Sequence, residues 1–297
     1  MSQDITARTV RISDLVPSVK RAMKRKRPVF IWGPPGVGKS EVVEGIAEEL
    51  GGIAIDIRLG MYEPTDIRGM PYYDKNTGKM VWAPPIDLPT EEMAAKYPVV
   101  VLFLDEMNQA SPSVQGAAFQ LILNRKVGQY KLPDNVVVVA AGNRETDKGV
   151  TFRMPTPLRN RFTHLELSVN FEDWQDWAVK NNIHPDVVGY LNFAKSDLFD
   201  FDPRASGNAF ASPRSWTFVS EYLYDEDDDQ EVTEAQLTDL ISGTVGEGIA
   251  VKFNTHRKFA SKLPVPTDIL DGKIKELPVD ARAVSYTHLR AHETVDY

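Results

Sequence analysis

The sequence of 297 residues contains no cysteine, which excludes disulfide bonds, thiolate zinc sites, iron–sulfur clusters and cysteine nucleophiles. Long apolar runs are missing too. The longest, 99–104 and 136–141, fall far short of the ~20 residues that a membrane-spanning helix needs. No apolar segment follows a basic start, so we expect a cytoplasmic protein with no secretory signal and no membrane span. Basic charge is not in excess: 34 Lys and Arg stand against 42 Asp and Glu, and the net charge of −8 disfavours a globally basic nucleic-acid binder.

Histidine is scarce and forms no HExxH or other metal-binding pattern, so we expect surface or packing roles for His164, His184, His256, His288 and His292. The basic stretch 20–27 is a candidate contact for nucleic acid or an acidic partner. We favour the other interpretation, the solvated end of a helix, where cations suit the negative end of the dipole. The acidic run 225–229 is expected to be a loop.

The first half of the chain alternates short apolar runs with amphipathic stretches. Strands are expected at 28–32, 53–57, 99–104, 136–141 and 163–167, and helices at 40–50 and 111–123. Five strands separated by helices predict an α/β fold, a three-layer α/β/α core with a five-stranded parallel sheet covered on both faces. Hairpins are expected at 72–82, with its turn at 76–78, and at 127–132. From about residue 169 onward the pattern is helical.

The strand at 28–32 leads into a glycine-rich segment that fits the P-loop pattern GxxxxGK[ST]: Gly33, Pro34, Pro35, Gly36, Val37, Gly38, Lys39 and Ser40. Glycines let backbone N–H groups wrap phosphates, and the following helix points its positive end at them. We expect Lys39 to reach the β- and γ-phosphates and Ser40 to hold Mg²⁺. A strand before the motif and an amphipathic helix after it favour a nucleotide site over a chance match.

Two further strand ends carry polar residues. The buried strand at 99–104 is followed by Asp105 and Glu106, which places two carboxylates at the carboxyl edge of the sheet, where nucleotides bind in open α/β folds. We expect Asp105 to coordinate Mg²⁺, directly or through water, and Glu106 to orient and deprotonate the attacking water. Asn143 follows the run 136–141 after one glycine and is a candidate partner of that water or of the γ-phosphate. Alone, the acidic pair would be an ordinary strand end and Gly142-Asn143 an ordinary turn.

These elements, with others, make the chain resemble the MoxR-like branch of the AAA+ ATPases, which is related to the dynein-type AAA domains. The resemblance covers roughly residues 10–220, and its matching stretches are Gly33–Ser40, Glu63–Gly69, Leu104–Ala110, Ala141–Arg144, Pro157–Phe162 and Ala211–Arg214. The compact size, and the short hairpin before the strand that leads to Asn143, resemble versions of this family found in bacteriophage genomes.

The resemblance implies further roles. Asn143 matches the sensor-1 position. Arg161 matches the arginine finger that acts on ATP bound by the neighbouring subunit, with Arg159 as the alternative. Arg214 matches sensor 2, which contacts the γ-phosphate within its own subunit. Cations placed against γ-phosphoryl oxygens favour phosphoryl transfer, whereas the plain alternative for each arginine is a surface salt bridge. The 72–82 hairpin corresponds to the family's helix-2 insert, a segment that faces the pore or the partner surface of a ring. The alternative is that the aromatic side chains of this hairpin pack on the core.

The resemblance also implies the whole protein's function: ATP hydrolysis with Mg²⁺ by a hexameric homo-oligomeric ring that remodels an unknown protein substrate or adaptor, in a bacterial or phage-infected cell. A nucleic-acid-directed motor or loader and a non-enzymatic nucleotide-dependent scaffold are the alternatives. Three segments are expected: a nucleotide-binding core at 1–168 with hairpin inserts near 70–83 and 126–133, a helical lid and truncated C-terminal segment at 169–283, and an adapter-derived tail at 284–297.

The tail departs from the family pattern. Residues 284–294 resemble the in-frame translation of a sequencing-library adapter, so we expect the natural chain to be truncated near Ala283. The rival interpretation is a genuine tail in which His288 and His292 form an i, i+4 metal pair, but no third histidine is placed to complete such a site.

Overall fold

The computed structural model describes residues 8–147, 149, 151–205, 207–224 and 232–260. The chain divides into two compact units, 1–168 and 169–297. The acidic run at 225–229, His288, His292 and the 284–297 tail lie outside the described residues.

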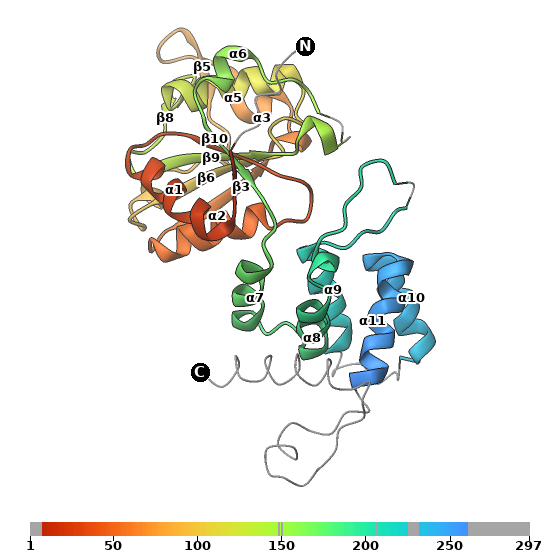
Figure 1. The fold of residues 1–297 in the computed structure, drawn as a ribbon. Helices are drawn as coiled ribbons and strands as arrows, with labels where there is room; N and C mark the ends of the chain where they lie inside the picture. Colours follow the sequence, from red (N-terminus) through yellow and green to blue (C-terminus); the bar gives the residue numbers. More distant parts are fainter. Residues whose placement is uncertain (1–7, 148, 150, 206, 225–231, 261–297) are drawn as a thin grey trace. The chain divides into compact units, whose positions relative to one another are not determined.

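A parallel sheet of six strands forms the centre of the first unit, in the order β1-β10-β2-β9-β6-β3 (Figure 1). The strands are β1 (Thr9–Val10), β2 (Val29–Trp32), β3 (Ile53–Arg58), β6 (Val100–Asp105), β9 (Val136–Gly142) and β10 (Thr163–Leu167). The expected strands are all present, but the prediction of five was wrong by one: β1 adds an edge strand that pairs in parallel with β10. Two residues are too few to show a strand period in a sequence.

Helices lie on both faces of this sheet. The α1 and α2 helices cover one face and α3 and α5 the other (Figure 1). The helices and 3-10 turns are α1 (Ile12–Lys24), α2 (Lys39–Glu49), η1 (Leu59–Met61), α3 (Pro64–Arg68), α4 (Glu91–Ala94), α5 (Pro112–Asn124), η2 (Glu145–Asp147) and α6 (Thr156–Arg159). The α5 helix begins as the sequence predicts, because the Ser111 hydroxyl accepts a hydrogen bond from the Val114 N–H and Pro112 occupies the first turn.

The β6 and β9 strands run through the middle of the core, and every residue of β9 is buried. A parallel strand covered by helices on both faces is apolar along its whole length, which explains the continuous runs in the sequence. The last residue of β6, Asp105, is only partly buried, so the polar residues begin where the strands leave the core.

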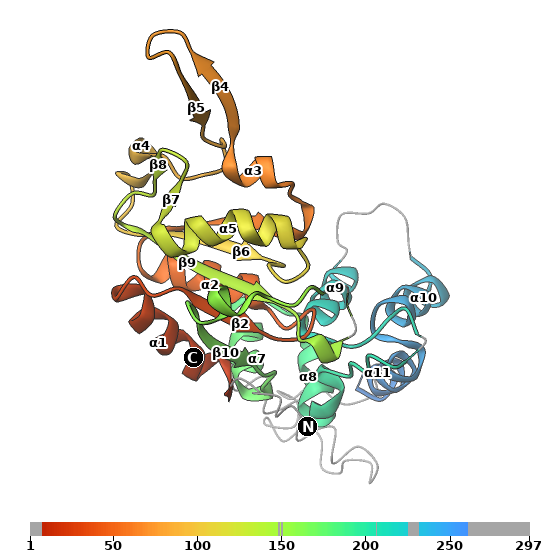
Figure 2. The same cartoon turned by 90° about the horizontal axis from the view of Figure 1, so that it is seen from above.

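Two hairpins interrupt the alternation of strands and helices, as expected. The first pairs β4 (Met70–Asp74) with β5 (Lys79–Ala83), and the second pairs β7 (Lys126–Val127) with β8 (Tyr130–Lys131). Figure 2 shows the β4–β5 hairpin extending away from the sheet. Its Trp82 packs over the second hairpin, because a Cβ on Gly128 would lie 3.2 Å from the Trp82 Cβ. Farther out, Tyr73 and Met80 are each 60% exposed. The hairpin therefore contacts the second hairpin near its own base, where Trp82 is still 40% exposed, and leaves apolar side chains exposed beyond it.

The second unit is helical. Its elements are α7 (Phe171–Lys180), α8 (Pro185–Phe193), η3 (Lys195–Leu198), α9 (Pro213–Leu223), α10 (Glu234–Val245) and α11 (Glu247–Ala260). Tyr190, Trp216 and Phe253 lie at the centre of its core, and the Trp216 indole N–H donates to the Asp197 carbonyl at 2.9 Å. Within the part of the chain that the structure describes, no helix is both long and apolar enough to cross a membrane.

The turn between α2 and β3 generates a stability prediction. Gly51 has a φ of +69°, with room for a Cβ, whereas a Cβ on Gly52 would lie 2.1 Å from the Val99 carbonyl oxygen. We expect Gly52→Ala to destabilise the first unit by about 3 kcal/mol, because the chain leading into β6 must shift. Gly51→Ala is the matched control, with a cost of about 1 kcal/mol for the left-handed backbone alone. Urea unfolding measures both, and equal losses would contradict the prediction.

Candidate nucleotide site

The segment Gly33–Ser40 joins the end of β2 to the start of α2. Gly36 and Gly38 have φ values of +75° and +85°, a conformation that glycine adopts without steric cost. Gly38 is also the N-cap of α2 and has no side-chain acceptor, so no capping side chain engages the first-turn N–H groups. Open N–H groups at the start of a helix attract anions, and the loop therefore suits a phosphate chain.

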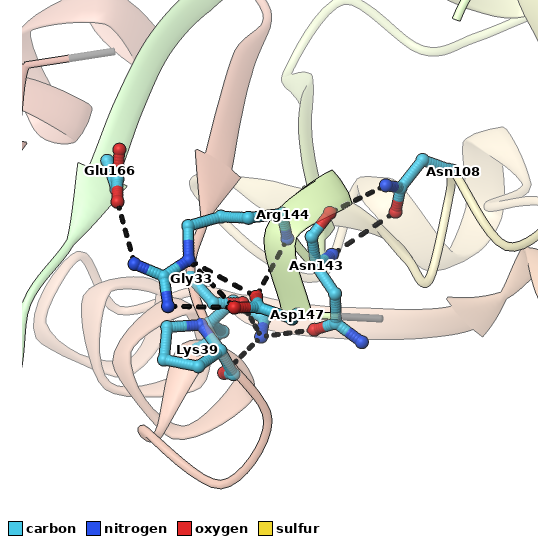
Figure 3. A network of polar contacts seen from close by, with 8 residues as sticks. Gly33, Lys39, Asn108, Asn143, Arg144, Asp147 and Glu166 are labelled. Carbon is cyan, nitrogen blue, oxygen red and sulfur yellow. Dashed lines mark hydrogen bonds and ion pairs between the residues drawn. The ribbon is translucent and has the colours of Figure 1, made fainter. Parts of the chain in front are cut away.

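Lys39 connects this loop to the end of β9. Its ammonium donates to the carbonyls of Gly33 and Pro34, both at 2.9 Å, and to the Asn143 Oδ1 at 3.1 Å (Figure 3). The structure thus brings together the predicted phosphate-binding lysine and the predicted sensor asparagine, which are 104 positions apart in the chain.

Ser40 lies against Asp105. The Ser40 hydroxyl donates to the Asp105 Oδ2 at 3.3 Å. Within the described residues, no group of three or more His, Asp or Glu side chains could hold a metal ion by itself. Mg²⁺ is usually bound by one or two protein oxygens together with substrate phosphates, and a hydroxyl beside a carboxylate is the donor set it prefers. The residues present therefore fit a magnesium–nucleotide complex.

Glu106 has an unusual backbone. Its φ is +52°, in the left-handed region, and its N–H donates to the Asp105 Oδ1 at 2.7 Å. A Cβ on Gly60 would lie 3.0 Å from the Glu106 Oε2, so the carboxylate lies beside η1. A glutamate in this conformation costs about 1–2 kcal/mol and persists only where its surroundings hold it. Here the next N–H, of Met107, is held by the Ala141 carbonyl at 3.0 Å.

Acidic charge accumulates at this edge. Asp56 of β3 has a raised pKa, caused first by burial and then by the charge of Asp105, while Arg58 opposes the shift. The Arg58 Nε lies 3.4 Å from the Asp56 Oδ2. A cation bound beside Asp105 would reduce the repulsion between the two carboxylates, which is a further point of fit with Mg²⁺.

Asn143 follows the last residue of β9, and a second asparagine holds its backbone. The Asn108 Nδ2 donates to the Asn143 carbonyl at 2.7 Å, and the Asn143 N–H donates to the Asn108 Oδ1 at 3.2 Å (Figure 3). Asn108 is 2% exposed. No role for Asn108 was predicted, although it lies in the stretch Leu104–Ala110 that carries the resemblance.

Arg144 is a second residue whose part was not predicted. Its guanidinium lies 2.8 Å from the Asp147 Oδ1 and 3.1 Å from the Glu166 Oε1. The hydrogen bond to Asp147 is the largest cause of the raised pKa of Arg144. This ion-pair network, also drawn in Figure 3, ties the loop after β9 to β10.

Of the predicted arginines, the two in the first unit, Arg159 and Arg161, lie outside the Lys39–Asp105–Asn143 cluster. Arg161 is exposed between α6 and β10, and within the described residues no hydrogen bond or ion pair joins its side chain to that cluster. Arg159, at the end of α6, has its guanidinium 3.5 Å from the Thr156 hydroxyl. Arg214 is exposed in the first turn of α9, in the second unit.

His164 connects α6 to the strand before the P-loop. The Trp32 indole N–H donates to the His164 Nδ1 at 3.0 Å, and the His164 Nε2 lies 2.7 Å from the Arg159 carbonyl. An indole N–H only donates, so Nδ1 accepts and the proton resides on Nε2, which donates to Arg159. This is a packing role, as expected for His164.

The family comparison agrees with this geometry. Residues 29–168 match the model of the ATPase family associated with various cellular activities (AAA). The matched range runs from β2 through β10 and includes the P-loop, Asp105, Glu106 and Asn143. The chain therefore carries an AAA family ATPase domain, a P-loop domain of the class that hydrolyses ATP.

Several curated proteins are similar to parts of the chain. Midasin of Giardia intestinalis is 25% identical over 181 residues, which is 58% of this chain and 4% of midasin. The Lon protease of Aquifex aeolicus is 28% identical over 181 residues, 56% of this chain and 21% of that protein. The proteasome-associated ATPase of Renibacterium salmoninarum is 28% identical over 144 residues, 42% of this chain and 23% of that protein. The chain thus spans less than a quarter of the length of each of these relatives.

Among solved structures, NtrX of Brucella abortus has a TM-score of 0.48 and 15% identity, covering 98% of this chain and 62% of NtrX.

Binding and hydrolysis are expected to separate in two variants. Lys39→Ala removes the cation that faces the phosphate-binding loop and should abolish ATP binding. Glu106→Gln keeps the shape of the side chain but lacks a base, so it should bind ATP and lose most turnover. Equilibrium binding of a fluorescent ATP analogue and a phosphate-release assay measure the two effects. The controls are the same substitutions at two separate exposed residues, Lys26→Ala and Glu92→Gln. Turnover of Glu106→Gln close to that of the parent would remove Glu106 from catalysis.

Proposed function

We propose that the chain hydrolyses ATP with Mg²⁺ as one subunit of an oligomeric ring, a hexamer, and couples hydrolysis to the remodelling of a protein partner. The observation that carries this proposal is the contact of Lys39 with Asn143 beside the Ser40–Asp105 pair, at one edge of the sheet in an AAA domain.

The side chains divide the reaction between them. Lys39 and the loop N–H groups bind the β- and γ-phosphates, and Ser40 and Asp105 hold Mg²⁺, which when bound neutralises charge on the phosphate oxygens. Asn143 orients the attacking water. Glu106 accepts the proton of that water as its oxygen bonds to the γ-phosphorus. The bond from the γ-phosphorus to the β–γ bridging oxygen breaks, and ADP leaves with that electron pair.

The arginines complete the site in this proposal. Arg161 is exposed, so it is available to a neighbouring subunit, and we assign it rather than Arg159 as the finger. Arg159 already has its guanidinium beside Thr156 and its carbonyl bonded to His164. Arg214 contacts the γ-phosphate within its own subunit. Each arginine stabilises charge that develops on the transferred group.

Two observations support a protein partner. The similar curated proteins include a Lon protease and a proteasome-associated ATPase, whose names connect them with protein degradation. The MoxR-like resemblance points the same way, and a bacterial or phage-infected cytoplasm is the location it suggests. The nucleic-acid alternative rests on the basic stretch 20–27 at the end of α1. Two of its lysines already have acidic partners, since Lys20 pairs with Glu49 and Lys26 lies 3.8 Å from Asp134, and this weakens the alternative.

Subunit mixing tests the ring. Arg161→Ala should bind ATP normally and lose about 10³-fold in turnover, because it lacks the finger. Mixed with Lys39→Ala, it should recover part of the activity, since a Lys39→Ala subunit supplies an intact arginine to its neighbour's intact nucleotide site. Phosphate release across mixing ratios, with mixed assembly confirmed by two affinity tags, is the measurement. Arg159→Ala is the matched variant and is mixed with Lys39→Ala in the same way. If only the Arg159→Ala mixture recovers activity, Arg159 is the finger. If neither arginine variant recovers activity on mixing, the result counts against catalysis between subunits.

The choice of partner class has its own test. ATP hydrolysis should respond little to added single- or double-stranded DNA or to RNA at 50 or 200 mM salt. Binding to a phosphate backbone would give stimulation that falls steeply between these salt concentrations. An unfolded protein such as reduced α-lactalbumin is the positive comparison. Strong, salt-sensitive stimulation by nucleic acid would replace protein remodelling with the motor or loader alternative.

A further inference from the structure

Asn108 is a buried amide that the proposed reaction does not use. It lies in the loop between β6 and α5, two residues after Glu106, and is 2% exposed. Its own carbonyl accepts the Phe152 N–H at 2.6 Å, so its backbone is held as well as its side chain. A buried amide is costly unless its donor and acceptor are both satisfied, and the partners of Asn108 show what it does.

Both of those partners belong to the backbone of one residue, Asn143. The amide donates to the Asn143 carbonyl at 2.7 Å and accepts the Asn143 N–H at 3.2 Å. The N–H belongs to the peptide before the Asn143 Cα and the carbonyl to the peptide after it. Holding both peptide planes fixes φ and ψ of Asn143 and therefore the direction of its Cα–Cβ bond. Figure 3 shows the result: the Asn143 Oδ1 faces Lys39, at 3.1 Å from the ammonium.

The space for this amide depends on Gly142. A Cβ at that position would lie 2.3 Å from the Asn108 Oδ1 and 2.9 Å from the Phe30 Cζ. The contact also needs one donor and one acceptor on a short planar group. Asparagine has both, whereas an aspartate carboxylate has no donor and a leucine has neither.

We infer that Asn108 is a positioning residue for ATP hydrolysis: its amide orients Asn143 toward the γ-phosphate and the attacking water, and it acts through Asn143 alone. The inference rests on the proposed function. In this role Asn108 itself contacts neither the nucleotide nor the metal ion nor the attacking water.

Asn108→Ala is the direct test. It removes both hydrogen bonds, so Asn143 is free to turn, and a misplacement of about 1 Å can cost about 10²-fold in rate. We expect kcat to fall by about 10- to 100-fold. The Kd for ADP should stay within about twofold, because the loop N–H groups and the contacts of Lys39 with the Gly33 and Pro34 carbonyls are untouched. Loss of ADP affinity in parallel with kcat would overturn the inference in favour of a structural role.

A double-mutant cycle separates positioning from general damage. If Asn108 acts through Asn143, adding Asn108→Ala to Asn143→Ala should not lower kcat further. Multiplying losses would overturn the inference, as would full activity of Asn143→Ala alone. If Asn108→Ala shows no cooperative melting, Asn108→Asp takes its place in the cycle, because it keeps the shape of the side chain and lacks the donor at pH 8.

Asn135→Ala is the matched control. Its amide also makes two hydrogen bonds to backbone groups, the Ala94 and Tyr97 carbonyls, both at 2.8 Å, and it lies just before the opposite end of β9. It should lower the melting temperature and leave kcat unchanged; a kcat loss equal to that of Asn108→Ala would overturn the inference. A parent chain that does not hydrolyse ATP would overturn the proposed function as well, whereas an active parent with fully active Asn108 variants would overturn this inference alone.

Discussion

The parallel pairing of β9 with β2 on one side and β6 on the other determines where the whole candidate nucleotide site lies. Trp32 is opposite Gly142, and Leu104 is opposite Ala140, so the three strands end at nearly the same level. The residues that follow them must then come together at one edge. A slip of one residue in either pairing would exchange the side chains of β9 between its two covered faces and move Asn143 out of line with the ends of β2 and β6, so the apolar core and the site depend on the same register.

Main-chain groups do most of the holding at this edge. Lys39 is held by two loop carbonyls, Glu106 is followed by an N–H that bonds to Ala141, and Asn143 is held at both its peptide groups. The partners of Lys39 in the loop and of the Met107 N–H are main-chain groups, which do not rotate away as side chains do, and the side chain that holds Asn143, that of Asn108, is buried. The polar groups are therefore kept in place before any nucleotide contributes contacts, which is the preorganisation that electrostatic catalysis requires.

The predictable part of the site is the part encoded locally. The P-loop, Asp105 and Glu106 each follow an apolar run directly, so periodicity and motif spacing predict them. The edge strand β1 has too few residues to leave such a signal. Asn108 contacts a residue 35 positions away and Trp32 one 132 positions away, and only the folded sheet brings these pairs together. The positive φ of Glu106 likewise comes from tertiary packing, because nothing in glutamate itself favours it.

The missing Cβ of Gly142 has a consequence for how this chain can change over time. Positions 108 and 142 share one small volume, which Phe30 closes from the other side. A larger residue at 142 excludes the amide at 108, and even without that amide a Cβ at 142 would still lie 2.9 Å from the Phe30 Cζ. A substitution at 142 therefore requires changes at both 108 and 30, and a chain that loses this contact must hold the backbone of Asn143 in a different way.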